Sequence, residues 1–264
     1  VPKLADTTAN QKNVAIVLDE KLILKILSKR YRNVSITEII TKNDLKKLAL
    51  RKPDLVFSGV KYFYFADEII WLNDYLEFHD ILYIASNRTA LHNEHDKSIA
   101  KKIIQKANIR TANFFTTEPG EHQNEMSIPI SFPLFIKPLT GGDSRGVDAN
   151  SIVYDFLSFQ AKVLDIKHKH DMCSLVETYL SGKEYSVSIL QDHSNGNLIA
   201  MPIEIVVKKN INGHRILDYD IKDNDHEKVI EVSDRKIFNQ LSDLAKNAFT
   251  ALGGKSMGRI DIKM

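Results

Sequence analysis

A glycine-rich loop directly follows a lysine at the end of an apolar run. Residues 132–136 read FPLFI, which predicts a buried strand, and Lys137 comes next. The following loop, PLTGGDSRGVD, contains Gly141, Gly142 and Gly146, and unhindered backbone N–H groups in such a loop can wrap a phosphate. The loop matches neither the P-loop nor the dinucleotide glycine pattern. Taken alone, it fits a phosphate site and an exposed hairpin turn equally well.

Two glutamates flank a short connection further along the chain. Glu177 and Glu184 lie in the stretch LVETYLSGKEYSV, between two strand-like pieces. Such a segment could offer adenine an apolar slot with backbone groups at its edge, and a carboxylate for ribose hydroxyls. Two surface glutamates on a hairpin are the plainer alternative.

Two further stretches carry candidate charges. Lys222 stands in an acidic neighbourhood, in HRILDYDIKDND, where it could bind phosphate or pair loosely with a nearby aspartate. In GRIDIKM, strand alternation puts Arg259, Asp261 and Lys263 on one face. Arg259 and Asp261 could form a plain ion pair, or they could stabilise a phosphate charge and bind Mg²⁺, which commonly takes one or two carboxylates.

Strand-like and helix-like runs alternate in the first third of the chain, which predicts βαβ units and a parallel sheet. We expect strands at 13–19, 33–37, 54–59 and 81–86, and helices at 20–31, 43–50 (capped by Asn43) and 66–80. These elements predict a small α/β domain over residues 1–93.

The remaining elements predict an α+β arrangement that positions the candidate residues. We expect helices at 95–107, 155–169 and 233–252 (capped by Ser233, with Gly253 past its end), and strands at 133–137, 173–180, 184–191, 197–209 and 257–264. The three consecutive strands between 173 and 209 predict an antiparallel meander. Most lysines of the first helix, which are Lys97, Lys101, Lys102 and Lys106, lie off its apolar stripe and favour a solvated basic face.

Composition narrows the function classes. The chain has 264 residues, and 36 basic against 34 acidic side chains give a net charge of +2, which gives no reason to expect a nucleic-acid partner. No apolar run reaches the roughly 18 residues of a membrane helix, so no membrane partner is expected. Cys173 is the only cysteine, which excludes intramolecular disulfides and cysteine-rich zinc sites and fits a cytoplasmic protein.

The order of these segments resembles the ATP-grasp superfamily, and within it the D-alanine:D-alanine ligase branch. The resemblance runs from about His95 to Met264. It is carried by HDKSIAKKIIQKANIRTANFF, FPLFIKPLTGGDSRGVD, LVETYLSGKEYSVSIL, DYDIKD and GRIDIKM. The implied fold class is α/β, with α+β in the C-terminal part: an ATP-grasp fold preceded by a small parallel α/β domain. Its central and C-terminal subdomains would span 94–178 and 179–264.

The resemblance implies a role for each candidate residue. The phosphates of ATP would be contacted by Lys97, Lys137 and Lys222. Adenine would be read by Glu177 and the backbone of Tyr179 and Leu180, and ribose would be held by Glu184. The γ-phosphate would be covered by Gly142, Asp143 and Ser144. Arg259 would stabilise the transferring phosphoryl group, with Ser144 as the second catalytic residue, and Asp261 would bind Mg²⁺.

The implied reaction is the ATP-dependent joining of a small carboxylate, such as an amino acid, to an amine through an acyl phosphate. A non-catalytic nucleotide-binding or regulatory ATP-grasp protein is the alternative, and a homodimer is the association that the resemblance raises. The sequence departs from the branch at VAIVLDEKLILK, which has no glycine, and at Asp143, where a serine is usual, so we expect a different substrate group. The remaining metal ligands are expected beyond Met264, so we expect this chain to be a truncated and inactive form.

Overall fold

The computed structural model divides the chain into two compact units, Val1–Leu91 and His92–Met264. The structure describes residues 19–66, 68–142, 144–192, 194–209, 213–218, 221 and 226–264. The predicted boundary at 178 is not tested by this division and stays a prediction.

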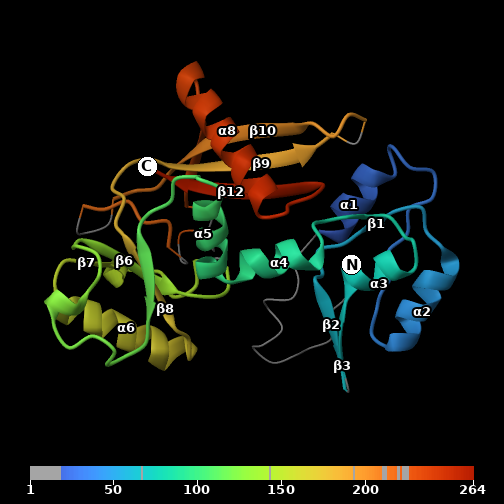
Figure 1. Cartoon of the computed structure of the whole chain (residues 1–264). Coiled ribbons are helices and arrows are strands. Elements are labelled where there is room, and N and C mark those ends of the chain that lie inside the picture. The colour runs from blue at the N-terminus through green and yellow to red at the C-terminus, as the bar shows by residue number, and fades with distance from the viewer. Residues whose placement is uncertain are drawn as a thin grey trace. The chain divides into compact units, whose positions relative to one another are not determined.

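The first unit contains a short parallel pair of strands, a hairpin and surrounding helices (Figure 1). Its elements are α1 (Glu20–Leu27), α2 (Lys42–Arg51), β1 (Val56–Phe57), β2 (Tyr62–Phe65), β3 (Glu68–Trp71), α3 (Leu72–Phe78), β4 (Tyr83–Ile84) and α4 (Arg88–His95), which crosses the boundary. β1 pairs with β4 in parallel, as predicted for this unit. β2 and β3 form an antiparallel pair.

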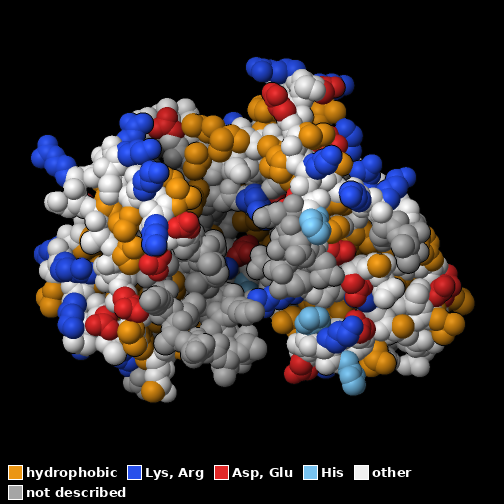
Figure 2. Space-filling view, turned by 180° about the vertical axis from the view of Figure 1, so that it is seen from behind, with side chains coloured by type: hydrophobic (Ala, Val, Ile, Leu, Met, Phe, Trp, Pro, Cys, Tyr) orange, Lys and Arg blue, Asp and Glu red, His pale blue; other side chains and the backbone are white. Residues whose placement is uncertain are grey.

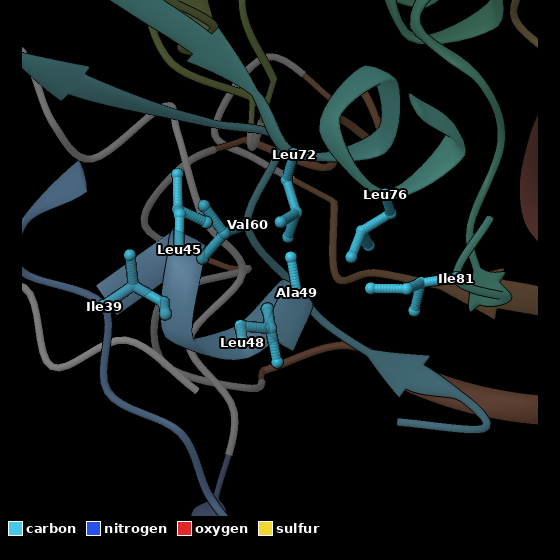
Figure 3. Close-up of a cluster of buried hydrophobic side chains, with 8 residues drawn as sticks. All are labelled: Ile39, Leu45, Leu48, Ala49, Val60, Leu72, Leu76 and Ile81. Carbon is cyan, nitrogen blue, oxygen red and sulfur yellow. The ribbon is translucent and has the colours of Figure 1, made fainter. Parts of the chain in front are cut away.

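One apolar cluster forms the core of this unit. Leu45 and Leu48 of α2 lie in one cluster with Leu72 and Leu76 of α3 and with Val60 (Figure 3). These residues recur at helical spacing along each helix, so that one face of each is apolar. The cluster therefore packs α2 against α3.

Three predictions for this unit are wrong. The helix predicted at 66–80 is helical only from Leu72, because Glu68–Trp71 pairs with the aromatic strand Tyr62–Phe65. Residues 33–37 form no strand in the described structure; most of their side chains are exposed. The cap of α2 is Thr41, not Asn43, since Thr41 and Asp44 exchange hydrogen bonds in a capping box. The strand predicted at 13–19 lies outside the described residues except for Asp19.

The second unit begins with α5 and a sheet covered by α6 (Figure 1). Its elements are α5 (Lys97–Lys106), β5 (Phe114–Thr117), a 3₁₀ turn (Glu125–Ser127), β6 (Leu134–Pro138), a second 3₁₀ turn (Ala149–Ser151), β7 (Ile152–Val153), α6 (Phe156–His170) and β8 (Ser174–Thr178). The strand order is β5-β8-β6-β7, and all pairs are antiparallel. Leu134 and Ile136 of β6 are fully buried beneath α6, in one cluster with Val163 and Ile166.

A second sheet completes this unit. Its elements are β9 (Glu184–Gln191), β10 (Leu198–Val206), β11 (Lys228–Glu231), α8 (Arg235–Ala251) and β12 (Met257–Lys263). The order is β11-β10-β9-β12, antiparallel throughout, and α8 packs on one face of it (Figure 1). Tyr185, Val187 and Ile189 alternate along β9 and are buried against α8. Gly253 has the positive φ of 80° that ends α8, as predicted.

Two predictions for the second unit are wrong. The meander from 173 to 209 is split, because β8 pairs with β5 and β6 in the first sheet, and only β9 and β10 form the predicted antiparallel pair. The N-cap of α8 is Asp234, not Ser233; its side chain accepts from the backbone N–H groups of Lys236 and Ile237. A carboxylate at this position also interacts favourably with the helix dipole.

The described surface shows mixed chemistry. On the face in Figure 2, lysine and arginine side chains are interspersed with acidic and hydrophobic ones. None of the described helices combines the length and apolar character that a membrane crossing needs.

Candidate functional site

Lys97 ties the start of α5 to the glycine-rich loop. Asp96 caps this helix by accepting from the backbone N–H groups of Ser98 and Ile99. The Lys97 amine donates to the carbonyl oxygens of Pro138, Leu139 and Gly141, at 3.0, 3.3 and 2.8 Å. Burial and the nearby charge of Lys137 lower the pKa of Lys97 to about 8. A cation is therefore held at the mouth of the loop at neutral pH.

Glu177 lies between two lysines from different elements. Its Oε1 pairs with Lys101 of α5, and its Oε2 pairs with Lys137 of β6. Burial alone would raise the pKa of Glu177, but the charges of Lys137 and Lys101 outweigh it, so that the pKa lies below the ordinary value. The carboxylate is therefore anionic and buried, with one lysine on each oxygen.

The strand register explains this convergence. Glu177 of β8 lies opposite Phe135 of β6, one position before Ile136 and two before Lys137. Two residues apart on one strand share a face, so Phe135, Lys137 and the opposing Glu177 lie on the same side of the sheet. The other side, with Leu134 and Ile136, packs against α6. β6 therefore buries one face in the core and presents the other to the site.

The glycine-rich loop has the backbone that its composition predicts. Gly146 has a φ of 73°, and a Cβ at this position would lie 2.6 Å from Cγ of Pro138, so only glycine fits without displacement. Gly142 has open space where a side chain would be. Ser144 has a φ of 54°, and its hydroxyl donates to the carbonyl of Leu217 at 2.9 Å. Asp143 lies outside the described residues.

The connection after β8 carries the predicted adenine segment. The backbone N–H of Tyr179 donates to the carbonyl of Pro133 at 3.1 Å, so this donor is engaged within the protein. Leu180 follows and is half-buried. The Tyr179 hydroxyl lies 3.4 Å from Nδ1 of His214.

A second charged group lies on the neighbouring strands β9 and β12. Asp261 accepts from the hydroxyl of Ser186 at 2.8 Å, and its Oδ1 lies 3.2 Å from Nε of Arg259. The Lys263 amine lies 3.3 Å from Glu184 at the start of β9. These ion pairs agree with the predicted common face of the three β12 residues. The group thus contains two carboxylates, Asp261 and Glu184, and two cations, Arg259 and Lys263. All four side chains are partly exposed.

Residues 213–218 contact the glycine-rich loop and the last residue of β12. The carbonyl of Leu217 accepts from Ser144 of the glycine-rich loop, and the carbonyl of Arg215 lies 3.5 Å from the amine of Lys263. These two carbonyls are only two residues apart in the chain, so one short segment lies beside both the glycine-rich loop and the end of β12. Lys222, which is predicted to follow this segment into the site, lies outside the described residues.

The structure thus gathers half of the predicted site residues into two groups. Lys97, Lys137 and Glu177 form the first, and Glu184, Arg259 and Asp261 form the second. Sequence reasoning missed Lys101, which was assigned with its neighbours to a solvated face. The spacing could have indicated it. Residues at i and i+4 share a helix face, and Lys101 follows the predicted site residue Lys97 by four.

Asp261 is the residue that could contribute to a magnesium site. It is a half-exposed carboxylate beside a hydroxyl, which is compatible with Mg²⁺ as a hard cation that takes oxygen ligands. Within the described ranges, no three His, Cys, Asp or Glu side chains gather as a protein-only metal site would require.

A protein-family comparison decides the relationship. The model of the family described as D-ala D-ala ligase C-terminus matches residues 103–264, which is more than half of the chain. The chain belongs to this family. The predicted resemblance and the predicted ATP-grasp fold class are therefore confirmed.

Individual relatives of this ligase family agree. The D-alanine--D-alanine ligase A of Mesorhizobium japonicum is 28% identical over 193 residues, which cover 71% of this chain and 52% of that protein. The D-alanine--D-alanine ligase of Pelotomaculum thermopropionicum is 26% identical over 262 residues, covering 96% and 78%. A crystal structure of D-alanine--D-alanine ligase from Bacillus anthracis has a TM-score of 0.66 and 25% identity, and covers 92% of this chain and 75% of that one. The chain spans about half the length of the curated relatives it matches first.

Proposed function

We propose that this protein is an ATP-dependent ligase that joins a small carboxylate, such as an amino acid, to an amine through an acyl phosphate. Its membership of the D-alanine ligase family supports this proposal. The main structural support is that Lys97, Lys137 and the buried Glu177 lie together beside the glycine-rich loop. A cluster with two such cations beside a glycine-rich loop fits a polyphosphate better than it fits a structural ion pair.

Different residues of the chain bind the phosphates, the base and the ribose. In our proposal, Lys97, Lys137 and Lys222 neutralise the phosphates, while Gly142, Asp143 and Ser144 cover the terminal one. Glu177, with the backbone of Tyr179 and Leu180, faces the adenine base, and Glu184 accepts from the ribose hydroxyls. Lys97 comes from the start of a helix and Lys137 from the end of a strand. The protein therefore holds the phosphates in a fixed position before any reaction starts.

Phosphoryl transfer requires positioning and charge stabilisation more than covalent help from the protein. Arg259 stabilises the charge on the transferring group, and Ser144 orients it. Asp261 would hold Mg²⁺, which supplies charge neutralisation between the phosphates when bound. Arg259 and Asp261 already lie side by side on β12, so the two charges that act on the phosphoryl group come from one strand.

Phosphate release tests this function. The full-length protein is incubated with ATP, Mg²⁺ and a panel of D- and L-amino acids, and inorganic phosphate is measured. We expect release above the ATP-only background with at least one amino acid, together with a dipeptide-like product by mass spectrometry. Binding of ATP without release for any amino acid or amine would instead favour the non-catalytic nucleotide-binding protein.

Lys97 predicts how ATP binding depends on pH. Its pKa is about 8 in the free protein, and a bound polyphosphate favours the ammonium and raises that pKa. Affinity is then full below about pH 8 and falls as the pH rises above it, by at most about tenfold per pH unit, because a proton must first be taken up. Isothermal titration calorimetry between pH 7.5 and 10 measures both the affinity and the proton uptake.

The control for this prediction is Lys97→Arg. Arginine stays charged throughout this range, so the variant is expected to bind ATP without the Lys97-dependent decline. A wild-type affinity that follows the same pH course as that of Lys97→Arg would contradict the assignment of Lys97 to the phosphates.

The homodimer and the cytoplasmic location stay predictions. Sedimentation of the full-length protein tests the first, and cell fractionation tests the second.

A further inference from the structure

Lys101 is a buried cation that the proposed reaction does not use. Its side chain is 11% exposed, and its amine pairs with Glu177 and donates to Oγ1 of Thr111 at 2.7 Å. The amine also lies 5.1 Å from the ring centre of Phe114, within the range of a cation–π interaction. A lysine is rarely buried unless its charge is paired, so this position must have a specific partner. That partner is Glu177, which lies 76 residues away in the chain.

The two lysines on Glu177 are not equivalent. Lys137 has a side chain that is 25% exposed and lies at the end of β6, where the glycine-rich loop begins. It can turn to a phosphate. Lys101 is held by Thr111 and the Phe114 ring, and its Nζ stays beside Oε1 of Glu177. When a nucleotide draws Lys137 away, Lys101 is the counterion that remains.

We propose that Lys101 is a positioning residue that keeps Glu177 ionised in the occupied site, and that it thereby makes the site select a 6-amino purine over a 6-oxo purine. This inference rests on the proposed nucleotide site and deepens it. In this inference, Lys101 does not touch the base, and it affects base selectivity only through its ion pair with Glu177.

The selectivity follows from hydrogen-bond chemistry. An ionised carboxylate only accepts hydrogen bonds, whereas a protonated carboxyl group also donates one. The 6-amino group of adenine donates, so it matches the ionised form. The 6-oxo group of hypoxanthine or guanine accepts, so it is repelled by a carboxylate and would be bound by a carboxylic acid. A buried carboxylate without a counterion takes up a proton. Lys101 prevents this uptake.

The main test is Lys101→Met, which removes the charge and keeps a similar length. Affinities for ATP and ITP are measured by calorimetry at pH 7, in two buffers of different ionisation enthalpy. We expect the ATP-to-ITP affinity ratio to fall by about 10- to 100-fold, because the interaction lost is a buried charge-assisted hydrogen bond. We also expect ATP binding to take up more protons than in the wild type, since Glu177 becomes protonated as Lys137 leaves.

Lys102→Met is the matched control, because Lys102 is the exposed neighbour on the same helix. It is expected to leave the ratio and the proton uptake unchanged. A Lys101→Met protein that folds, as judged by circular dichroism, and keeps both wild-type values would overturn the inference.

If the Lys101→Met variant does not fold, the role of Lys101 is tested on the wild type by measuring the ATP-to-ITP affinity ratio as a function of pH. Lys101 predicts that the ATP-to-ITP ratio stays constant from pH 8 down to pH 5, because Glu177 stays ionised. A ratio that falls steadily as the pH is lowered to 5 would show that Lys101 does not hold the charge of Glu177, and would refute the inference. Failure of the nucleotide site itself has a different signature, which is a wild-type protein that binds neither ATP nor ITP.

Discussion

Replacing Lys137 with alanine is expected to weaken ATP binding by about 100-fold, since a charged hydrogen bond to phosphate is lost from a largely buried site. Lys137 lies where β6 meets the glycine-rich loop, so its amine is brought to the loop by the end of a strand. The measurement is calorimetric titration with a non-hydrolysable ATP analogue. Loss of affinity of this size identifies Lys137 as a phosphate ligand.

The fold is expected to survive the change at position 137. Glu177 keeps Lys101 as a counterion, so no buried charge is left unpaired. Lys169→Ala, on the exposed surface of α6, serves as the control and is expected to bind as the wild type does. Affinity of the Lys137→Ala protein equal to that of this control would count against the phosphate assignment.

Replacing Arg259 with alanine is expected to lower the rate of phosphate release by about 1,000-fold, in the range reported for arginines that stabilise a transferring phosphoryl group. ATP affinity is expected to change little, since the charge that Arg259 stabilises develops during transfer. Its side chain is 61% exposed on β12, so its removal creates no cavity. Steady-state phosphate release and ATP titration on the same sample separate the two effects.

Arg235→Ala is the matched control for this second variant. Arg235 is also exposed, and it belongs to the start of α8 instead of to β12. If Arg259→Ala and Arg235→Ala release phosphate at the same rate, Arg259 has no catalytic role. A parallel loss of ATP affinity would instead place Arg259 in nucleotide binding.

Long periodic segments of the second unit were predictable from the sequence. The helices α5, α6 and α8 and the strands β6, β9, β10 and β12 all occur where apolar spacing places them. The candidate residues at 137, 177, 259 and 261 could be placed on elements for the same reason. Their order along the chain, and not any one pattern, indicated the fold.

The remaining features depend on contacts between distant residues. The apolar residues of the run at 68–71 are compatible with either a helix or a strand. The run is a strand because it pairs with Tyr62–Phe65. Whether β8 continues into a meander or joins another sheet depends on β5 and β6, far upstream. Lys101 looked like a surface lysine because its burial depends on Glu177, which no local pattern reveals.

The hydrogen bond from Ser144 to the carbonyl of Leu217 has a consequence for how ligands and the chain compete. In the proposed site, a phosphate that takes the Ser144 hydroxyl must release residues 213–218 from this contact. Such competition is reciprocal. A reagent that binds this segment and holds it against Ser144 lowers the affinity for phosphate, and phosphate lowers the affinity for the reagent by the same factor. Since the acceptor is a main-chain carbonyl, changes to the side chain of residue 217 leave this antagonism in place.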